Sequence, residues 1–442
     1  MSIPLSEEQQ KVLELYRDGR NIFLTGPGGS GKSALIKRLY LEHTASEPPG
    51  GKTMCVCAMT GCAAVLLGCG AKTVHSFSGI GIGKGTVSEI VDRVYRNQKK
   101  ALRWRQTRVL IVDEVSMMSK RLLETLDAVA RRLRFCDQPF GGMQVIFCGD
   151  FYQICPVGSN EDPDSTAFCF ESPLWFKLFS PENHVVLTKI FRQRDDVYAG
   201  ILNEVRIGQI SPESAAVLQK CVGRSRPSDR VPTRLFAVRH LADAVNQSEL
   251  AKLPPPSLSF KMKECKDPSR TGFSSTEIHA ELHFLKTATL VEEIFTLKKG
   301  AHVMSIINVE LPDGRCLCNG SRGVILGFVG KDHLPVVRFE NGIEKTMDYH
   351  RWESDVIPGI RIEQIPLVLA WGLTIHKSQG CSLEEAEMDL GLTVFEYGQT
   401  YVALSRVKSL DGLYLTSLQL DNIFVNPRVH NFYQALSSID GR

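Results

Sequence analysis

The sequence predicts an α/β fold built on parallel sheets, and two patterns along the chain carry this prediction. Short apolar runs alternate with amphipathic helical patterns, which is typical of strands and helices stacked in layers. Several of the runs are apolar throughout, as strands buried on both faces of a parallel sheet should be. The runs predict strands at residues 21–25, 53–60, 109–115, 144–150, 184–190, 233–238 and 367–375.

The predicted helices lie between these runs. One amphipathic pattern begins at Ser33, directly after a glycine-rich turn. Another covers residues 122–134, where apolar side chains recur at the spacing that puts them on one face of a helix. The residues of that face are Leu122, Leu126, Val129 and Leu133.

Three segments depart from the alternation. Residues 68–108 contain several glycines. For the basic stretch 93–108 within them, a solvent-exposed helix face is the favoured prediction and a contact surface is the alternative. Residues 298–352 form short β-type runs between Gly, Asn-Gly and Asp-Gly turns, which predicts a small antiparallel barrel inserted into the second α/β layer. Residues 252–276 are rich in Pro, Lys and Ser and predict a loop or linker.

The composition excludes several classes of protein. Of the 442 residues, 43% are hydrophobic and 23% charged, a globular balance that excludes general disorder. The net charge of +3 is too small to require a polyanionic partner. No run approaches the ~18 apolar residues of a membrane span, and the N-terminus lacks a signal or transit pattern. We therefore expect a soluble protein, cytoplasmic in a bacterium or a viral host, or nuclear.

The 13 cysteines are scattered and form no CxxC pair. Zinc ribbons and disulfide frameworks therefore lack support in the sequence. This usage predicts a reducing compartment.

A phosphate-binding loop is predicted at residues 26–33, which read GPGGSGKS and match G-x-x-x-x-G-K-[ST] between a strand and a helix. The glycines let the backbone wrap a phosphate, and successive N–H groups face the anion. Lys32 should reach the β- and γ-phosphates, and the Ser33 hydroxyl should hold Mg²⁺. The predicted nucleotide-binding residues of the loop are Gly26, Pro27, Gly28, Gly29, Ser30, Gly31, Lys32 and Ser33.

Acidic and amide side chains follow two further predicted strands. The run VLIVDE at 109–114 delivers Asp113 and Glu114 to one edge of the sheet. Asp113 would hold Mg²⁺, and Glu114 would orient and deprotonate an attacking water. Gln153, in GDFYQ at 149–153, would sense the γ-phosphate or the water; a turn built on the Gly-Asp pair explains that segment equally well.

Taken together, the motifs resemble the Pif family of superfamily-one DNA helicases, in its 5′-to-3′ branch. The resemblance runs from Leu5 to about Tyr433, and its motifs agree in order, spacing and residue identity. This chain departs from the family after Gln153. The family usually has two prolines after this glutamine, whereas here Ile154 and Cys155 precede a single proline, Pro156. The matching segments are LSEEQ (5–9), AMTGCAA (58–64), TVHSFSGIG (73–81), residues 116–157, LTKIFRQRD (187–195), LTIHKSQGCS (373–382) and YVALSRVKS (401–409).

The resemblance implies a set of site residues. Gln9 would contact the adenine base, with Gln10 as the alternative, and Gly380 would also contact the nucleotide. Arg192 and Arg406 resemble two arginine fingers, each placing a planar charge against the γ-phosphate. The implied DNA contacts are Thr60, Gly61, His75, Phe77, His376, Lys377 and Ser378. Candidates for base stacking, for which a place in the core is the strong alternative, are Phe77, Phe151, Tyr152 and Trp371.

The resemblance also implies the domains. Residues 1–176 would form a first RecA-like motor domain, with an insertion at about 68–108 as candidate wedge. Residues 177–285 and 363–442 would form a second motor domain, and residues 286–362 a small β-barrel resembling a Src-homology-three fold.

The function implied is that of an ATP- and Mg²⁺-dependent 5′-to-3′ DNA helicase. It would translocate on single-stranded DNA and unwind duplex, forked or structured DNA, including G-quadruplexes and RNA–DNA hybrids, in replication, repair, recombination or telomere maintenance. It would act as a monomer or dimerise on DNA. One alternative is a translocase that removes proteins with little unwinding. Another, which Glu114 and the two arginines argue against, is a P-loop kinase or GTPase.

Overall fold

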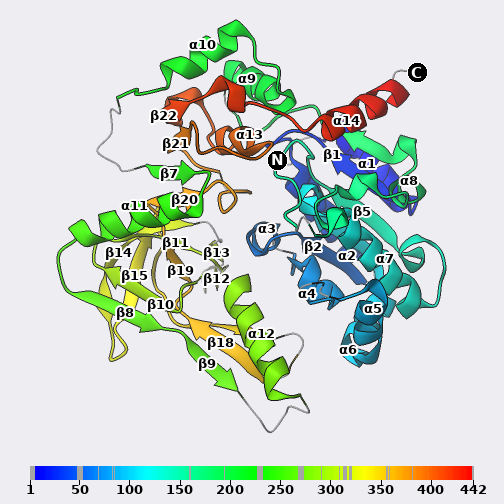
Figure 1. The fold of residues 1–442 in the computed structure, drawn as a ribbon, viewed down its shortest axis with the longest axis horizontal. Coiled ribbons are helices and arrows are strands. Elements are labelled where there is room, and N and C mark those ends of the chain that lie inside the picture. The colour runs from blue at the N-terminus through cyan, green and yellow to red at the C-terminus, as the bar shows by residue number, and fades with distance from the viewer. Residues whose placement is uncertain are drawn as a thin grey trace. The chain divides into compact units, whose positions relative to one another are not determined.

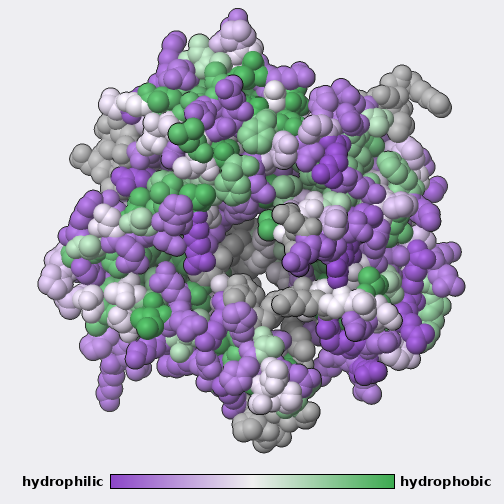
Figure 2. Space-filling view, viewed as in Figure 1, coloured by the Kyte–Doolittle hydropathy of each residue, from purple (hydrophilic) through white to green (hydrophobic). Residues whose placement is uncertain are grey.

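The computed structural model describes most of the chain. The described residues are 5–46, 53–67, 69–81, 83, 85–158, 161–193, 195–225, 232–266, 273–289, 291–307, 309–311, 316–317, 321–354, 357, 359–380 and 382–440. The chain forms two compact units, the first made of Met1–Arg226 with Ser382–Arg442 and the second of Pro227–Cys381. Hydrophilic residues cover most of the surface drawn in Figure 2.

The first unit is built on a six-stranded parallel sheet with strand order β3-β2-β4-β5-β1-β6. Figure 1 labels β1, β2 and β5 of this sheet. The long strands of the sheet coincide with the apolar runs, which confirms the predicted parallel α/β architecture. Because the strands are parallel, all their carboxyl ends meet at one edge. The strands are β1 (Ile22–Thr25), β2 (Thr53–Ala58), β3 (Lys72–Thr73), β4 (Thr107–Asp113), β5 (Gln144–Cys148) and β6 (His184–Val186).

Helices cover both faces of this sheet. Alternate residues of β4 show the division, since Leu110 and Val112 join one core cluster and Val109 and Ile111 the other. The second cluster is completed by α1 (Glu7–Arg17), α2 (Lys32–Ser46) and α3 (Gly61–Leu67). The first is completed by α4 (Val74–Ser78), α5 (Val87–Arg96), α6 (Gln98–Gln106), α7 (Lys120–Arg134), α8 (Trp175–Leu178) and α14 (Pro427–Asp440).

Basic residues of the stretch 93–108 cap the short helix α4. Arg103 Nη1 donates to the carbonyl oxygens of Ser76 at 2.9 Å and Phe77 at 3.2 Å. The buried Lys100 donates to the Ser76 carbonyl oxygen at 3.4 Å, and Trp104 Nε1 to that of Ser78 at 3.1 Å. The expectation of a solvated face is therefore wrong for Lys100 and Arg103. Their charges satisfy helix carbonyls that would otherwise lack partners.

Replacing Arg103 with methionine should lower the free energy of unfolding by about 1–3 kcal/mol, because two carbonyl groups lose a charged donor. Lys99→Met is the matched control, since Lys99 is exposed on the same helix. Its effect should stay within about 0.5 kcal/mol. Urea denaturation of the two variants measures the difference, and equal effects would contradict the capping role.

Further α/β structure completes the first unit. Helix α9 contacts α13, and the strands β21 and β22 pair in parallel. The elements are α9 (Asp196–Ile207), α10 (Pro212–Lys220), β21 (Ala386–Leu390), α13 (Gln399–Leu404) and β22 (Leu413–Leu418).

The second unit joins a parallel strand pair to antiparallel sheets. β7 (Thr233–Phe236) pairs in parallel with β20 (Gly372–Thr374), and α11 (Arg239–Lys252) packs against both. An antiparallel sheet has the order β16-β15-β14-β11-β19. Its strands are β11 (His302–Ser305), β14 (Arg322–Val329), β15 (Leu334–Phe339), β16 (Glu344–Thr346) and β19 (Leu367–Leu369).

Smaller antiparallel sheets complete this unit. β8 pairs with β10, β12 with β13, and β18 lies between β17 and β9. Helix α12 (Ser275–Ala288) packs against β18. The strands are β8 (Ser257–Lys261), β9 (Lys263–Lys266), β10 (Ile294–Lys298), β12 (Val309–Glu310), β13 (Cys316–Leu317), β17 (His350–Glu353) and β18 (Ile360–Gln364).

Two predictions fail in the second unit. The stretch 252–276 is not simply a loop, since it contains β8, β9 and the start of α12, although residues 267–272 lie outside the described part. The predicted strand 367–375 is two strands, β19 and β20, which pair with different partners. Ala370 and Trp371 separate them.

Candidate nucleotide site

The predicted motifs of the first unit follow the carboxyl ends of neighbouring strands. The glycine-rich loop 26–33 follows β1, Asp113 ends β4, and the segment 149–153 follows β5, which lies between them. β6 leads into 187–195 on the other side of β1. The predicted delivery of Asp113 and Glu114 to one edge of the sheet is confirmed.

The glycine-rich loop packs against the segment that follows β6. Gly29 has a φ of 84°, and a Cβ there would lie 2.5 Å from Arg192 Cβ, so only glycine fits. The Phe191 N–H donates to the Gly29 carbonyl oxygen at 2.9 Å. Lys32 Nζ donates to the carbonyl oxygens of Gly26 at 2.6 Å and Pro27 at 2.9 Å, so its ammonium lies over the loop.

Asp113 and Glu114 form an acidic pair at the end of β4. Burial and the neighbouring Glu114 carboxylate raise the pKa of Asp113. The Glu114 N–H donates to Asp113 Oδ1 at 2.9 Å. Glu114 has a left-handed backbone, with φ 58° and ψ 41°, a conformation that costs about 1–3 kcal/mol and is concentrated at functional sites.

The glutamine of the N-terminal motif lies against the loop. Gln9 is 6% exposed, and its Nε2 lies 3.1 Å from the position that a Cβ on Gly31 would take. Ser6 and Gln9 form a capping box at the start of α1, which fixes the orientation of the Gln9 side chain. The Gln10 side chain is exposed. The geometry therefore favours Gln9 over Gln10.

The two predicted arginine fingers meet at Ser405. Arg192 Nη1 donates to the Ser405 carbonyl oxygen at 3.1 Å, and Arg406 Nη2 donates to Ser405 Oγ at 2.7 Å. Arg406 is 2% exposed and also donates through Nε to the Val402 carbonyl oxygen at 2.9 Å. A Cβ on Gly28 would lie 3.4 Å from Ser405 Cβ, so this arginine pair is next to the glycine-rich loop.

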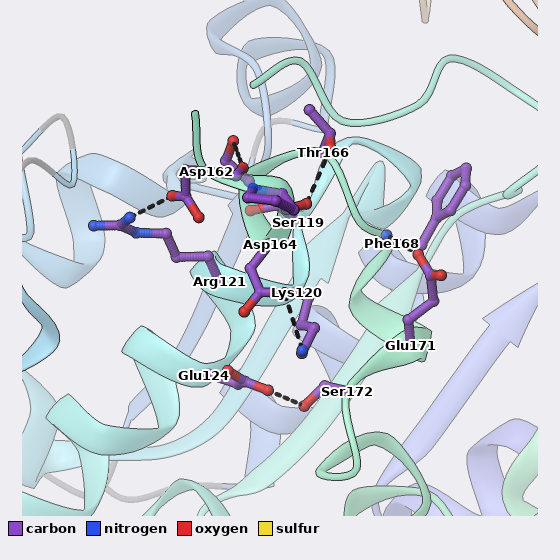
Figure 3. Close-up of polar contacts among 12 residues, drawn as sticks. Ser119, Lys120, Arg121, Glu124, Asp162, Asp164, Thr166, Phe168, Glu171 and Ser172 are labelled. Carbon is purple, nitrogen blue, oxygen red and sulfur yellow. Dashed lines mark hydrogen bonds and ion pairs between the residues drawn. The ribbon is translucent and has the colours of Figure 1, made fainter. Parts of the chain in front are cut away.

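The segment after Gln153 is fixed to α7, as Figure 3 shows. Lys120 pairs with Asp164 at 3.0 Å, and Arg121 pairs with Asp162. The Ser172 hydroxyl donates to Glu124 at 2.7 Å. These contacts join the start of the predicted motif region 116–157 to the residues that follow its end.

The aromatic candidates for base stacking are buried. Phe77, Phe151, Tyr152 and Trp371 are 2%, 2%, 7% and 4% exposed. The Phe77 ring packs on Trp104 with 4.9 Å between ring centroids. These rings contribute to the core, which was the alternative to stacking, so the DNA contact predicted for Phe77 does not fit its burial.

Three predicted DNA contacts of the first unit lie near the carboxyl ends of β2 and β3. Thr60 Oγ1 accepts from the Ala63 N–H at 3.2 Å and so caps α3, while Gly61 is exposed. His75 lies in α4, where burial lowers its pKa and favours the neutral ring.

The remaining predicted contacts belong to the second unit. His376 and Lys377 are partly exposed just after β20, whereas Ser378 is buried and donates to the Ile375 carbonyl oxygen at 2.8 Å. Lys377 lines a pocket that also includes Arg239 and Glu292. Gly380, the predicted nucleotide contact, has a φ of 83°.

Four residues near the glycine-rich loop were not predicted. Asp150, Arg206, Tyr401 and Tyr433 form a buried polar network beside it. Asp150 and Tyr401 lie inside quoted motifs and could have been proposed, but Arg206 and Tyr433 carry no motif signal.

A phosphate-binding loop between a buried strand and a helix, with an acidic pair two strands away in the same sheet, defines a P-loop nucleotide-binding protein. Among the described residues, no helix combines the length and apolar character needed to span a bilayer. The model of the PIF1-like helicase family matches residues 4–214.

Relatives and solved structures agree with this match. The chain is 30% identical to the ATP-dependent DNA helicase RRM3 of Saccharomyces cerevisiae, over 99% of this chain and 68% of that protein. It is 37% identical to the ATP-dependent DNA helicase PIF1 of Homo sapiens, of which it spans only 64%. The crystal structure of Pif1 helicase from Candida albicans matches with a TM-score of 0.79 at 32% identity, covering 99% of this chain and 100% of that one. The chain belongs to the PIF1-like helicase family.

Proposed function

We propose that the protein is an ATP-dependent DNA helicase that moves 5′ to 3′ on single-stranded DNA and separates duplexes. The observation that carries the proposal is the gathering of Lys32, the Asp113–Glu114 pair and two arginines around one glycine-rich loop. This set suits hydrolysis, because it combines a phosphate cradle, a candidate base and cations for the transition state.

Each side chain has a distinct role in the proposed reaction. Lys32 holds the β- and γ-phosphates, and Glu114 orients and deprotonates the water. Arg192 and Arg406 stabilise the charge that develops on the γ-phosphate, and Gln153 senses that phosphate. Gln9 contacts the adenine base, and Gly380 is a further proposed nucleotide contact.

The acidic pair also suits Mg²⁺. Two adjacent carboxylates, one of them buried with a raised pKa, form a donor set that a hard cation favours. Ser33 and Asp113 would hold the ion, which would neutralise phosphate charge during hydrolysis.

The proposed domains follow the family. Residues 1–176 form a first RecA-like motor domain, and residues 177–285 with 363–442 form a second. Residues 286–362 form a small barrel resembling a Src-homology-three fold, which the antiparallel sheet of β11, β14 and β15 supports. The insertion 68–108 is the proposed wedge. ATP binding favours closure of the motor domains and hydrolysis releases it, so DNA contacts on the two domains move in turn.

The proposed substrate is single-stranded and forked DNA, held through its backbone with weak sequence preference. Related structures are described as Bacteroides Pif1 bound to ssDNA and as two coordinating Pif1 helicases at forked dsDNA, at 26% identity. We propose a monomer that can pair on DNA, with G-quadruplexes and RNA–DNA hybrids as further substrates, acting in replication, repair, recombination or telomere maintenance. The proposed contacts are Thr60, Gly61, His75, His376, Lys377 and Ser378.

Stimulation by DNA separates this function from that of a P-loop kinase or GTPase. Single-stranded DNA should raise the rate of ATP hydrolysis at least tenfold, because DNA binding favours the closed motor. Steady-state phosphate release with and without a 30-nucleotide oligonucleotide measures this effect. Hydrolysis that ignores DNA would contradict the proposal.

A further inference from the structure

A buried ion pair lies between the segment after β5 and helix α9. Asp150 is fully buried, and the Arg206 side chain is 13% exposed. Arg206 donates through Nε to Asp150 Oδ2 and through Nη2 to Oδ1, both at 2.8 Å. Two parallel charge-assisted bonds fix the orientation of the carboxylate. The guanidinium also lies 4.6 Å from the centre of the Tyr152 ring and 5.4 Å from that of Tyr433.

Two tyrosine hydroxyls join this carboxylate to the glycine-rich loop. The Tyr401 hydroxyl lies 3.4 Å from Asp150 Oδ2 and accepts from the Gly28 N–H at 2.7 Å. The Tyr433 hydroxyl lies 3.4 Å from Asp150 Oδ1 and 2.6 Å from Thr25 Oγ1, at the end of β1. Both ends of the turn from strand to loop are therefore tied to one carboxylate.

The protonation states of Tyr401, Tyr433 and Arg206 allow all three side chains to donate hydrogen bonds to Asp150. Burial and the Asp150 carboxylate raise the pKa values of Tyr401 and Tyr433, so both hydroxyls stay protonated and can donate to Asp150. Burial lowers the pKa of Arg206, but its pairing with Asp150 outweighs that effect and the net shift is upward. The Arg206 guanidinium and the two tyrosine hydroxyls therefore keep their protons and remain donors in the network.

The helix that carries Tyr401 also leads to the predicted arginine finger. Gly398, the N-cap of α13, has a φ of 76°, and a Cβ there would lie 2.5 Å from the Tyr152 carbonyl oxygen. Only glycine permits this contact between α13 and the residues after β5. Arg406 follows the same helix at its other end. One end of α13 therefore lies against the backbone of Tyr152 and Gln153, and the other end leads to the arginine pair.

We propose that Asp150, oriented by Arg206, is a positioning residue that sets the glycine-rich loop against Arg406 through the hydroxyls of Tyr401 and Tyr433. The inference rests on the proposed ATP hydrolysis and adds to it four side chains to which no phosphate contact is assigned. A buried ion pair is weak support for stability alone, because desolvation offsets much of its attraction. The proposed role of the ion pair is to fix positions, since the glycine-rich loop and Arg406 must face the same γ-phosphate.

Removing one hydroxyl tests the proposal. Tyr401→Phe should lower kcat for DNA-stimulated ATP hydrolysis at least tenfold and leave KM for ATP within about twofold, because the misplaced finger loses a contact with charge that develops only in the transition state. Tyr198→Phe is the matched control. The Tyr198 hydroxyl is also buried and donates to α13, at the Leu404 carbonyl oxygen at 2.7 Å, but has no contact with the loop in any described hydrogen bond. Its kcat should stay within twofold of the parent value.

A second variant makes the result specific to the network. Asp150→Asn should reduce kcat as Tyr401→Phe does, and the double variant should be little worse than either, since both changes break one chain of contacts. Tyr433→Phe serves as the additional probe if either variant fails to fold by circular dichroism. Equal kcat for Tyr401→Phe and Tyr198→Phe, a rise in KM alone, or additive losses would each overturn the proposal. Absence of ATP hydrolysis by the unmodified protein would instead refute the proposed function.

Discussion

Replacing Lys32 with alanine should reduce ATP hydrolysis at least 10²–10³-fold, about the cost of removing one transition-state donor. Its ammonium lies over the glycine-rich loop, 2.6 Å from the Gly26 carbonyl oxygen, and the first turn of α2, which begins at Lys32, contains no other lysine. Binding of single-stranded DNA should persist within about threefold, because the proposed DNA contacts lie on other segments. Phosphate release and fluorescence anisotropy with a labelled oligonucleotide measure the two properties.

The control for this prediction is Lys37→Ala. Lys37 is exposed on the same helix, α2, so its removal changes the net charge equally without touching the loop. Hydrolysis by this variant should stay within twofold of the parent. A Lys32→Ala protein that is folded and still hydrolyses ATP at the parental rate would contradict the assignment of the phosphate site.

Replacing Arg406 with alanine should lower kcat by about 10³–10⁵-fold, as expected for loss of an arginine finger. The KM for ATP should change far less, because the contact forms with charge that develops in the transition state. Arg406→Lys should restore little activity, since a point charge cannot replace the planar fork. Steady-state kinetics with saturating DNA provide the measurement.

Two further measurements distinguish a catalytic role of Arg406 from a purely structural one. Arg406 is 2% exposed and bonded to Ser405 Oγ and the Val402 carbonyl oxygen, so thermal denaturation must accompany the kinetics. Arg428→Ala removes a partly exposed ion pair with Glu171 and should leave kcat unchanged. A rise in KM with constant kcat in Arg406→Ala would show that the finger assignment is wrong.

The first sheet and its edge could be predicted because the sequence pattern and the tertiary environment agree there. Strands buried on both faces are rich in apolar residues, and residues 109–112 of β4 and 145–148 of β5 form continuous apolar, buried runs. The continuous apolar character of residues 367–375 is also the reason why their division into β19 and β20 was not predicted. A continuous apolar run carries no mark of where one strand ends, and the break depends on the different partners, β11 and β7, of its two halves.

Polar segments were predicted less well, for a related reason. β8 and β9 are largely exposed, so their composition resembles that of a loop. Lys100 and Arg103 look like solvated charges in the sequence, and only the folded position of α4 gives them carbonyl partners. The Asp150–Arg206 network depends on tertiary contacts between distant segments, so no spacing in the sequence could reveal it.

The most direct test of the account compares strand separation on two forked DNA substrates of equal duplex sequence. One carries a single-stranded 5′ tail on the loading strand and the other a 3′ tail of the same length and sequence. With ATP and Mg²⁺, the account predicts unwinding of the 5′-tailed fork at a rate at least tenfold above that of the 3′-tailed fork. Equal rates, or a preference for the 3′ tail, would contradict the proposed polarity, and DNA-stimulated ATP hydrolysis without unwinding of either fork would favour a protein-removing translocase.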